Sequence, residues 1–180
     1  FFGALLLTPL LLKGWKEVKI LSNRGWISVI WVSLFGGVLG TFFYTKALSY
    51  LNYIDLSVVV LLQKFQPFFA IGLAAVVLRE PLTKNYLLCA VAAIAGGYFV
   101  TFDNGLSILA LDNETLIASL MALCAAFAWG SSTVLGKHAL QHLSFFVLTG
   151  LRLWITTFIV VILIYRLYRL YRLYRLYRLY

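Results

Sequence analysis

The feature that most limits the fold of this chain is the recurrence of apolar stretches of about 20 residues, each long enough to cross a ~30 Å hydrocarbon core as a helix. The chain has 180 residues, of which 63% are hydrophobic and 12% are charged, whereas a soluble domain is roughly 45–50% apolar and 25% charged. We therefore predict an all-α protein, a polytopic transmembrane helix bundle. Its full spans are expected at residues 26–50, 56–78, 86–102, 116–136 and 145–165.

The first apolar stretch is shorter than the others. Residues 1–12 would rise only about 18 Å as a helix, which is too short to cross alone. We interpret them as the second half of a further, partial span. No basic segment precedes this stretch and no small-residue cleavage site follows it, so a secretory signal is not expected.

Basic residues are concentrated in alternate loops. The loops around 13–25, 79–85 and 137–144 carry Lys or Arg, whereas the loops around 51–55 and 103–115 carry neither and hold acidic residues. By the positive-inside rule, the basic loops are cytoplasmic. The sequence thus predicts a multi-pass protein of the plasma membrane with lipid as its surroundings.

The C-terminal segment repeats Tyr-Arg-Leu with a strict period of three residues. This period matches neither the helix nor the strand, so on a helix the arginines spiral around and leave no apolar face. The segment holds five of the 15 basic residues, so the net charge of +9 does not indicate a nucleic-acid partner. We interpret residues 166–180 as a low-complexity tail. An artefact and a basic anchor for anionic headgroups are both open.

Polar residues interrupt one predicted span at mid-depth, in VVVLLQKFQPFF at residues 58–69. Lys64 lies about 12 Å below the outer boundary, and an ionisable residue at such depth usually faces a bundle interior or a wet cavity. Pro67 removes a backbone donor and frees a carbonyl near Gln63, which predicts a kink. We predict that Gln63, Lys64 and Gln66 bind substrate. A packing kink with interhelical amide bonds is the alternative.

Two other spans carry polar stripes at helical spacing. We predict that Thr41 and Tyr44, in the span at 26–50, line the same cavity as Arg152, in the span at 145–165. Arg152 lies about two turns from the inner end, so reaching the cytoplasmic interface is an alternative for it. Lys46, near the outer end of its helix, is expected to extend to the interface. The full stripes are Gly37, Thr41, Tyr44 and Thr45, and Thr149, Arg152 and Thr156.

Groups for catalysis or metal binding are sparse in this sequence. His138 and His142 are four residues apart without a nearby carboxylate or cysteine, so we interpret them as interfacial. Cys89 and Cys124 lie in apolar runs and are expected to behave as small hydrophobes. We predict no catalytic residue, no metal site, no cofactor and no enzymatic activity.

Small residues four apart recur in several spans and indicate close helix packing. Ser131, Ser132 and Thr133 are expected to bond mainly to their own helix, although substrate contact stays open. The small-residue sets are Gly36 and Gly40, Ala92 and Gly96, Ala93 and Gly97, and Ala122, Ala126 and Gly130.

A family resemblance covers nearly all of residues 1–165. Its most specific part, FGGVLGTFFYTKALSYLNYIDLSVVVLLQKFQPFFAIGLAAVVLREPL, resembles one half of the EamA-type drug/metabolite transporters. Arg79 departs from the small residue usual in that pattern. A second part, ALCAAFAWGSSTVLGK followed by LTGLRLW, is similar to the opening two helices of the other half. The first pattern falls on Gly36, Gly40, Tyr44, Ala47, Leu48, Ser57, Leu62, Pro67, Glu80 and Leu82.

The resemblance implies a ten-helix fold of two inverted repeats, of which this chain would lack the first helix and the last three. Residues 1–102 would then hold helices two to five, residues 103–115 an external loop, and residues 116–165 helices six and seven. It also implies structural roles for four residues and a bacterial inner-membrane location. The four residues are Gly36, Gly40, Pro67 and Glu80.

The function that the resemblance implies is secondary transport, with export of small metabolites such as amino acids or related compounds by alternating access. Lys64 and Arg152 would tolerate a carboxylate or another anion. The predicted spans hold no buried carboxylate for proton coupling, so the driving ion is open. The alternatives are an inactive fragment of such a transporter, a membrane enzyme or a scramblase, and a homodimer is also open.

Overall fold

The computed structural model describes residues 1–79, 81, 83–101 and 113–177, and every regular element in these ranges is helical. Four helical segments among the described residues are long and apolar enough to span a membrane. The all-α membrane bundle predicted from the sequence is thus confirmed. The four segments are Asn23–Leu48, Leu56–Val77, Asn113–Ala139 and Phe145–Arg172.

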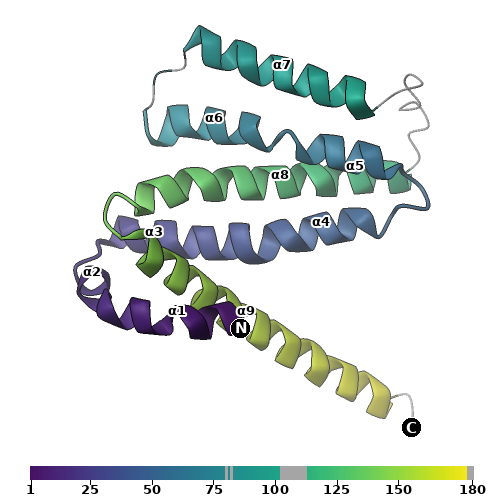
Figure 1. The fold of residues 1–180 in the computed structure, drawn as a ribbon. Coiled ribbons are helices and arrows are strands. Elements are labelled where there is room, and N and C mark those ends of the chain that lie inside the picture. Colours follow the sequence, from purple (N-terminus) through teal and green to yellow (C-terminus); the bar gives the residue numbers. More distant parts are fainter. Residues whose placement is uncertain (80, 82, 102–112, 178–180) are drawn as a thin grey trace.

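The chain forms a series of helices that lie side by side in layers (Figure 1). In the region of the predicted span at 86–102, the structure has an 18-residue helix, Lys84–Thr101. The elements in chain order are α1 (Phe2–Lys13), α2 (Trp15–Lys19), α3 (Asn23–Trp31), the π-helical η1 (Val32–Leu39), α4 (Gly40–Leu48), α5 (Leu56–Gln63), α6 (Gln66–Val77), α7 (Lys84–Thr101), α8 (Asn113–Ala139) and α9 (Phe145–Tyr177).

Helix α8 is the centre of the bundle. It packs against α3, η1 and α4 on one side and against α5 and α6 on the other (Figure 1). Alanines and serines dominate its buried face, which lets neighbouring backbones approach closely in the absence of a hydrophobic driving force between helices. Helix α9 crosses η1 and α1 in a further layer, and α7 packs on α5 at the opposite edge.

Two apolar clusters hold the two ends of the bundle. One joins α1, α2, α3, α8 and α9 around Val29 and Val147, which are 0% and 1% exposed. The other joins α4, α5 and α8 around Ala47, Val59 and Ala122, each 0% exposed. Between these clusters, the middle of the bundle is more polar, and the candidate site lies there.

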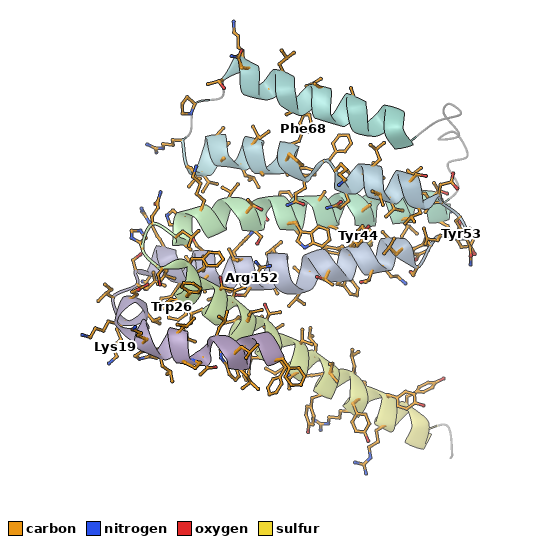
Figure 2. All side chains as sticks on the ribbon, viewed as in Figure 1. Lys19, Trp26, Tyr44, Tyr53, Phe68 and Arg152 are labelled. Carbon is orange, nitrogen blue, oxygen red and sulfur yellow. The ribbon has the colours of Figure 1, made fainter. Side chains whose placement is uncertain are left out.

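The predicted cytoplasmic loops lie at one end of the bundle. Lys19 marks that end in Figure 2 and Tyr53 marks the opposite one. The basic side chains at the Lys19 end are exposed, as interfacial charges should be. They are Lys13, Lys16, Lys19, Arg24, Arg79, Lys84 and Lys137.

Side chains from distant segments tie α9 to the bundle. Trp154 donates its indole N–H to Thr8 Oγ1 of α1 at 3.0 Å. The carboxylate of Glu17 accepts the backbone N–H of Ser144, immediately before α9, at 2.7 Å. An anion at a helix N-terminus is stabilised by the unpaired N–H groups and the helix dipole. These contacts fix the end of α9 that faces the basic loops.

The predicted kink near Pro67 is a break between two helices. Helix α5 ends at Gln63 and α6 begins at Gln66, so Pro67 falls in the first turn of α6, where its missing N–H costs nothing. Lys64 and Phe65 bridge the break, and their N–H groups bond within the turn. Pro67 itself is exposed.

Helix α6 ends at Val77 and the chain turns at Arg79, whose φ of 54° lies in the left-handed region. Glycine adopts this conformation without the steric cost that other residues meet. Arg79 is the residue that departs from the family pattern. The neighbouring Glu80 and Leu82, and most of the predicted external loop at 103–115, lie outside the described residues.

The C-terminal repeat continues helix α9 as far as Tyr177. Helix α9 extends well past the other helices (Figure 1). Residues 165–172 are exposed on every side, which fits the expectation that the three-residue period produces no buried face. Its origin and role stay as predicted from the sequence.

Candidate functional site

A cavity of about 660 Å³ lies between α6, α8, α9 and η1. Lys137 and Phe145 line it near the basic end of the bundle, where α8 joins α9. Trp129 lines it about 12 Å farther along α8, near the middle of the span. Such a volume and a mixture of apolar walls with a few polar groups are typical of small-molecule sites.

Trp129 forms the inner wall of the cavity. Its ring centroid lies 5.5 Å from that of Tyr44 on α4, with the ring planes tilted by 52°. A Cβ added at Gly40 would overlap the Trp129 indole. The absence of a side chain at Gly40 therefore lets α4 pack directly on this ring, and Tyr44 supports it from the side.

Gln66 reaches the cavity because α6 approaches α8 very closely. A Cβ at Gly130 would lie 2.8 Å from Gln66 O and 3.1 Å from Ala70 N, both backbone atoms of α6. Gly130 thus permits the first turn of α6, directly after the break, to rest on α8. Gln63 donates its side-chain amide to Gln66 Oε1 at 3.4 Å, so the two glutamines face one another across the break.

Arg152 brings a positive charge to the cavity from α9. The residue is half-buried, and its Nη2 donates to the backbone carbonyl of Gly36 in η1 at 3.3 Å. One turn along α9, Thr156 Oγ1 donates to Ser33 O at 3.1 Å. Figure 2 shows Arg152 at the crossing of α9 with the α3–η1–α4 helix.

Hydroxyl groups complete the polar lining. Thr133 donates to Trp129 O at 2.9 Å and Thr149 donates to Phe145 O at 2.8 Å, so both protons are used within their own helices. Their oxygens still have lone pairs that can accept a hydrogen bond from a ligand. The adjacent Ser131, which is not among the lining residues, donates to Ala128 O and accepts the indole N–H of Trp31. The expected bonding of Ser131 and Thr133 to their own helix is confirmed.

A neighbouring cavity of about 410 Å³ lies between α6 and α8 and shares Thr133 and Lys137 with the first. Its walls are mainly alanine and aliphatic side chains, such as Ala70, Ala74 and Leu78. Among the described residues that line it, none is aromatic, and the polar ones are Thr83, Thr133 and Lys137. The cavity beside Trp129 and Arg152 is therefore the stronger candidate site.

The structure brings together some of the predicted site residues and separates others. Gln66 and Arg152 line the cavity, and Gln63 and Tyr44 contact residues that line it. Thr41 is exposed and bonds to Gly37 O of its own helix, at 3.3 Å. Lys64 is exposed at the helix break. The substrate roles of all six residues remain predictions.

Trp129 is one of the cavity residues that the predicted set of binding residues lacked. Its signal in the sequence is a large aromatic within AAFAWGSS, a run of otherwise small residues at mid-span, apart from Phe127. Small neighbours leave room for other helices to approach, so a lone indole there is well placed to form a wall. The expected packing roles of Gly36 and Gly40 agree with the close contacts at both positions.

Comparison with known proteins agrees with this architecture. The EamA-like transporter family matches residues 1–102. The chain belongs to this family. The matched residues are the same as the predicted first half of the fold, whereas the assignment of residues 116–165 to a second half stays a prediction. The chain is thus an integral, multi-pass membrane protein of a transporter family.

A curated relative extends the similarity beyond the family domain. The chain is 42% identical over 149 residues to the riboflavin transporter ImpX of Fusobacterium nucleatum subsp. nucleatum. The match covers 83% of this chain and 50% of the relative, so the chain spans about half the length of that protein. No solved structure shows a significant match to the chain.

Proposed function

We propose that this chain forms the substrate-binding part of a transporter that moves a small molecule across the membrane by alternating access. The observation that carries the proposal is the cavity beside Trp129 and Arg152, in a chain of an EamA-like transporter family. In carriers built from repeats, substrates bind near the middle of the membrane. Trp129 and Gln66 lie at that depth.

Riboflavin is the substrate that we propose to test first, because it is named for the similar protein from Fusobacterium. The chemistry of the cavity suits it. A planar ring system can stack on the Trp129 indole. The guanidinium of Arg152 and the amide of Gln66 can bond the carbonyl and imide groups of the ring edge, and the hydroxyl oxygens of Ser132 and Thr149 can accept from the sugar-alcohol chain.

Amino acids and related compounds, expected from the family resemblance, stay in the substrate panel. Arg152 can pair with a carboxylate in a bidentate manner, but an amino acid would leave the Trp129 ring wall largely unused. Export is the direction expected from the resemblance. We propose that the cavity opens toward the cytoplasm, because it extends to Lys137 at the basic end.

Flux of labelled riboflavin into and out of proteoliposomes containing this chain tests the proposal. Trp129→Ala is expected to lower flux at least fivefold, since stacking on an aromatic side chain contributes about 1–3 kcal/mol in comparable systems. Arg152→Ala is also expected to lower flux, because the cavity loses the guanidinium that would bond to the substrate. Trp15→Ala is the matched control, because Trp15 lies in α2, outside the residues that line the cavity.

Each alternative has its own outcome in this experiment. Equal flux by the wild type, Trp129→Ala and Trp15→Ala would show that the cavity does not carry the substrate. Saturable riboflavin binding without flux would favour an inactive fragment, and flux that rises with the square of chain concentration would favour a homodimer. Movement of labelled lipid without riboflavin flux would favour a scramblase.

A further inference from the structure

The middle of the α3–η1–α4 helix is π-helical over Val32–Leu39. Such turns are rare, occur mainly as short interruptions of α-helices, and are frequent at functional sites. The segment includes Gly36 and Gly37, and glycine is among the weakest helix formers. Local sequence therefore does not fix the helical register of η1, and contacts from other helices must contribute.

Helix α9 supplies two of those contacts. Thr156 Oγ1 donates to Ser33 O and Arg152 Nη2 donates to Gly36 O, at 3.1 and 3.3 Å. Arg152 and Thr156 are four residues apart, so they share one face of α9. Both acceptors are backbone carbonyls of η1. One face of α9 thus holds the backbone of the π-helical segment.

Gly36 and Gly37 allow the backbone of η1 to pack closely against side chains of α9 and α8. A Cβ at Gly37 would overlap Thr156, and a Cβ at Gly36 would overlap Ser132 and lie 3.4 Å from Arg152 Nη2. The backbone of η1 therefore rests directly on these side chains. A displacement of the Arg152 guanidinium therefore removes one of the contacts that the backbone of η1 makes with α9.

The same guanidinium lines the candidate substrate cavity. It carries five N–H donors, and the bond to Gly36 O is the hydrogen bond that the structure records for it among the described residues. At 3.3 Å this bond is longer than the roughly 2.7–2.9 Å of a charge-assisted bond to an anionic oxygen. A substrate oxygen placed in the cavity can therefore compete for Arg152.

We propose that Arg152 couples substrate binding to the conformation of η1, an inference that rests on the proposed transport function. A carbonyl or anionic oxygen of the substrate takes the guanidinium from Gly36 O, and η1 then loosens from α9. A ligand shifts such an equilibrium only through a difference in affinity for the two arrangements, and Arg152 provides that difference. By linkage, loosening of η1 must favour substrate binding to the same extent.

Hydrogen exchange measured by mass spectrometry on the chain in lipid nanodiscs tests the coupling. We expect riboflavin to raise the exchange rate of backbone amides in residues 32–44. In Arg152→Gln without ligand, the same amides should exchange about tenfold faster than in the wild type, since the bond from a charged donor is lost. Riboflavin should then change their exchange no further. If Arg152→Gln does not fold, Arg152→Lys, which keeps the positive charge, takes its place as the test variant.

Thr156→Val is the matched control. Thr156 is not among the residues that line the cavity, so this variant loses the bond to Ser33 O but keeps Arg152 available to substrate. We expect faster exchange in η1 together with an intact response to riboflavin. Quenching of flavin fluorescence measures binding in parallel for every variant.

Three results have different meanings. Riboflavin binding with unchanged exchange in residues 32–44 would overturn the coupling. Wild-type exchange rates in a folded Arg152→Gln variant would overturn the role of Arg152 in holding η1. Failure of the wild type to bind riboflavin would instead reject riboflavin as the substrate, and the comparison without ligand would still decide whether Arg152 holds η1.

Discussion

The contact between α6 and α8 at Gly130 gives the sharpest prediction about packing. A methyl group at this position would lie 2.8 Å from Gln66 O, 3.0 Å from Phe69 Cβ and 3.1 Å from Ala70 N. Two of these three atoms belong to the backbone of α6, so no side-chain rotation can relieve the overlap. To regain ordinary contact at about 3.5 Å, α6 must move away by roughly 0.7 Å.

The stability cost of the overlap in Gly130→Ala can be measured by comparison with Gly72→Ala. Overpacking by one methylene or methyl in a tight interior typically costs about 1–3 kcal/mol. Replacing glycine by alanine in a helix also contributes a gain of about 1 kcal/mol in helix propensity, whatever the surroundings. Gly72 in α6 has no atom within 4 Å of an added Cβ, so Gly72→Ala shows the gain alone. The difference between the two variants isolates the overlap.

We expect Gly130→Ala to be less stable than Gly72→Ala by about 1–3 kcal/mol. Unfolding by SDS in mixed micelles, followed by circular dichroism, measures this difference. Gly130→Ala should also weaken substrate binding, because Gln66 moves out of the cavity with α6. Equal stability of the two variants would refute the close approach at Gly130. Gly96→Ala repeats the control in α7, because an added Cβ at Gly96 also has no atom within 4 Å.

Three further predictions concern the ends of the bundle. Glu17→Gln should lower the free energy of unfolding by about 0.3–1 kcal/mol, because the N-terminus of α9 loses an anion; a matching loss in Lys16→Gln would contradict this. Arg79→Gly should be neutral or up to about 1 kcal/mol more stable in the same SDS titration, since glycine accepts a φ of 54°. Membrane-impermeant maleimide should label Ile20→Cys from the cytoplasmic side and Asn52→Cys from the opposite side, and labelling of both from one side would reject the orientation.

Much of the fold could be predicted because its determinants are local in the sequence. The length of an apolar run sets whether a helix can cross the membrane, and loop charge sets its orientation. The helix break before Pro67 is local for the same reason, since a proline lacks the N–H that would continue the helix. The π-helical register of η1 was not predicted. Its backbone carbonyls accept hydrogen bonds from Arg152 and Thr156, which lie far away in the chain.

The candidate site was predictable only in part, and Lys64 shows why. Depth along a span is readable from sequence, so a cavity role was reasonable for a lysine about 12 Å from the boundary. The direction of a side chain around the helix axis, however, depends on the geometry of the break, and in the structure Lys64 is exposed. Arg152 lies on the unbroken helix α9, in a helical stripe with Thr149 and Thr156. In the structure, Thr149 and Arg152 line the cavity and Thr156 bonds to η1.

The two irregular segments of this bundle lie on opposite sides of the same stretch of α8. The break at Lys64 and Phe65 precedes the turn of α6 that rests on Gly130, and η1 contacts Ser132 through Gly36. Irregular backbone at membrane depth is tolerated where protein buries it or where it lines a cavity. Gln66, directly after the break, and Val32, at the start of η1, both line the cavity beside Trp129. Both irregular segments therefore border the proposed substrate site from different sides, and a transporter has to change its conformation around its substrate.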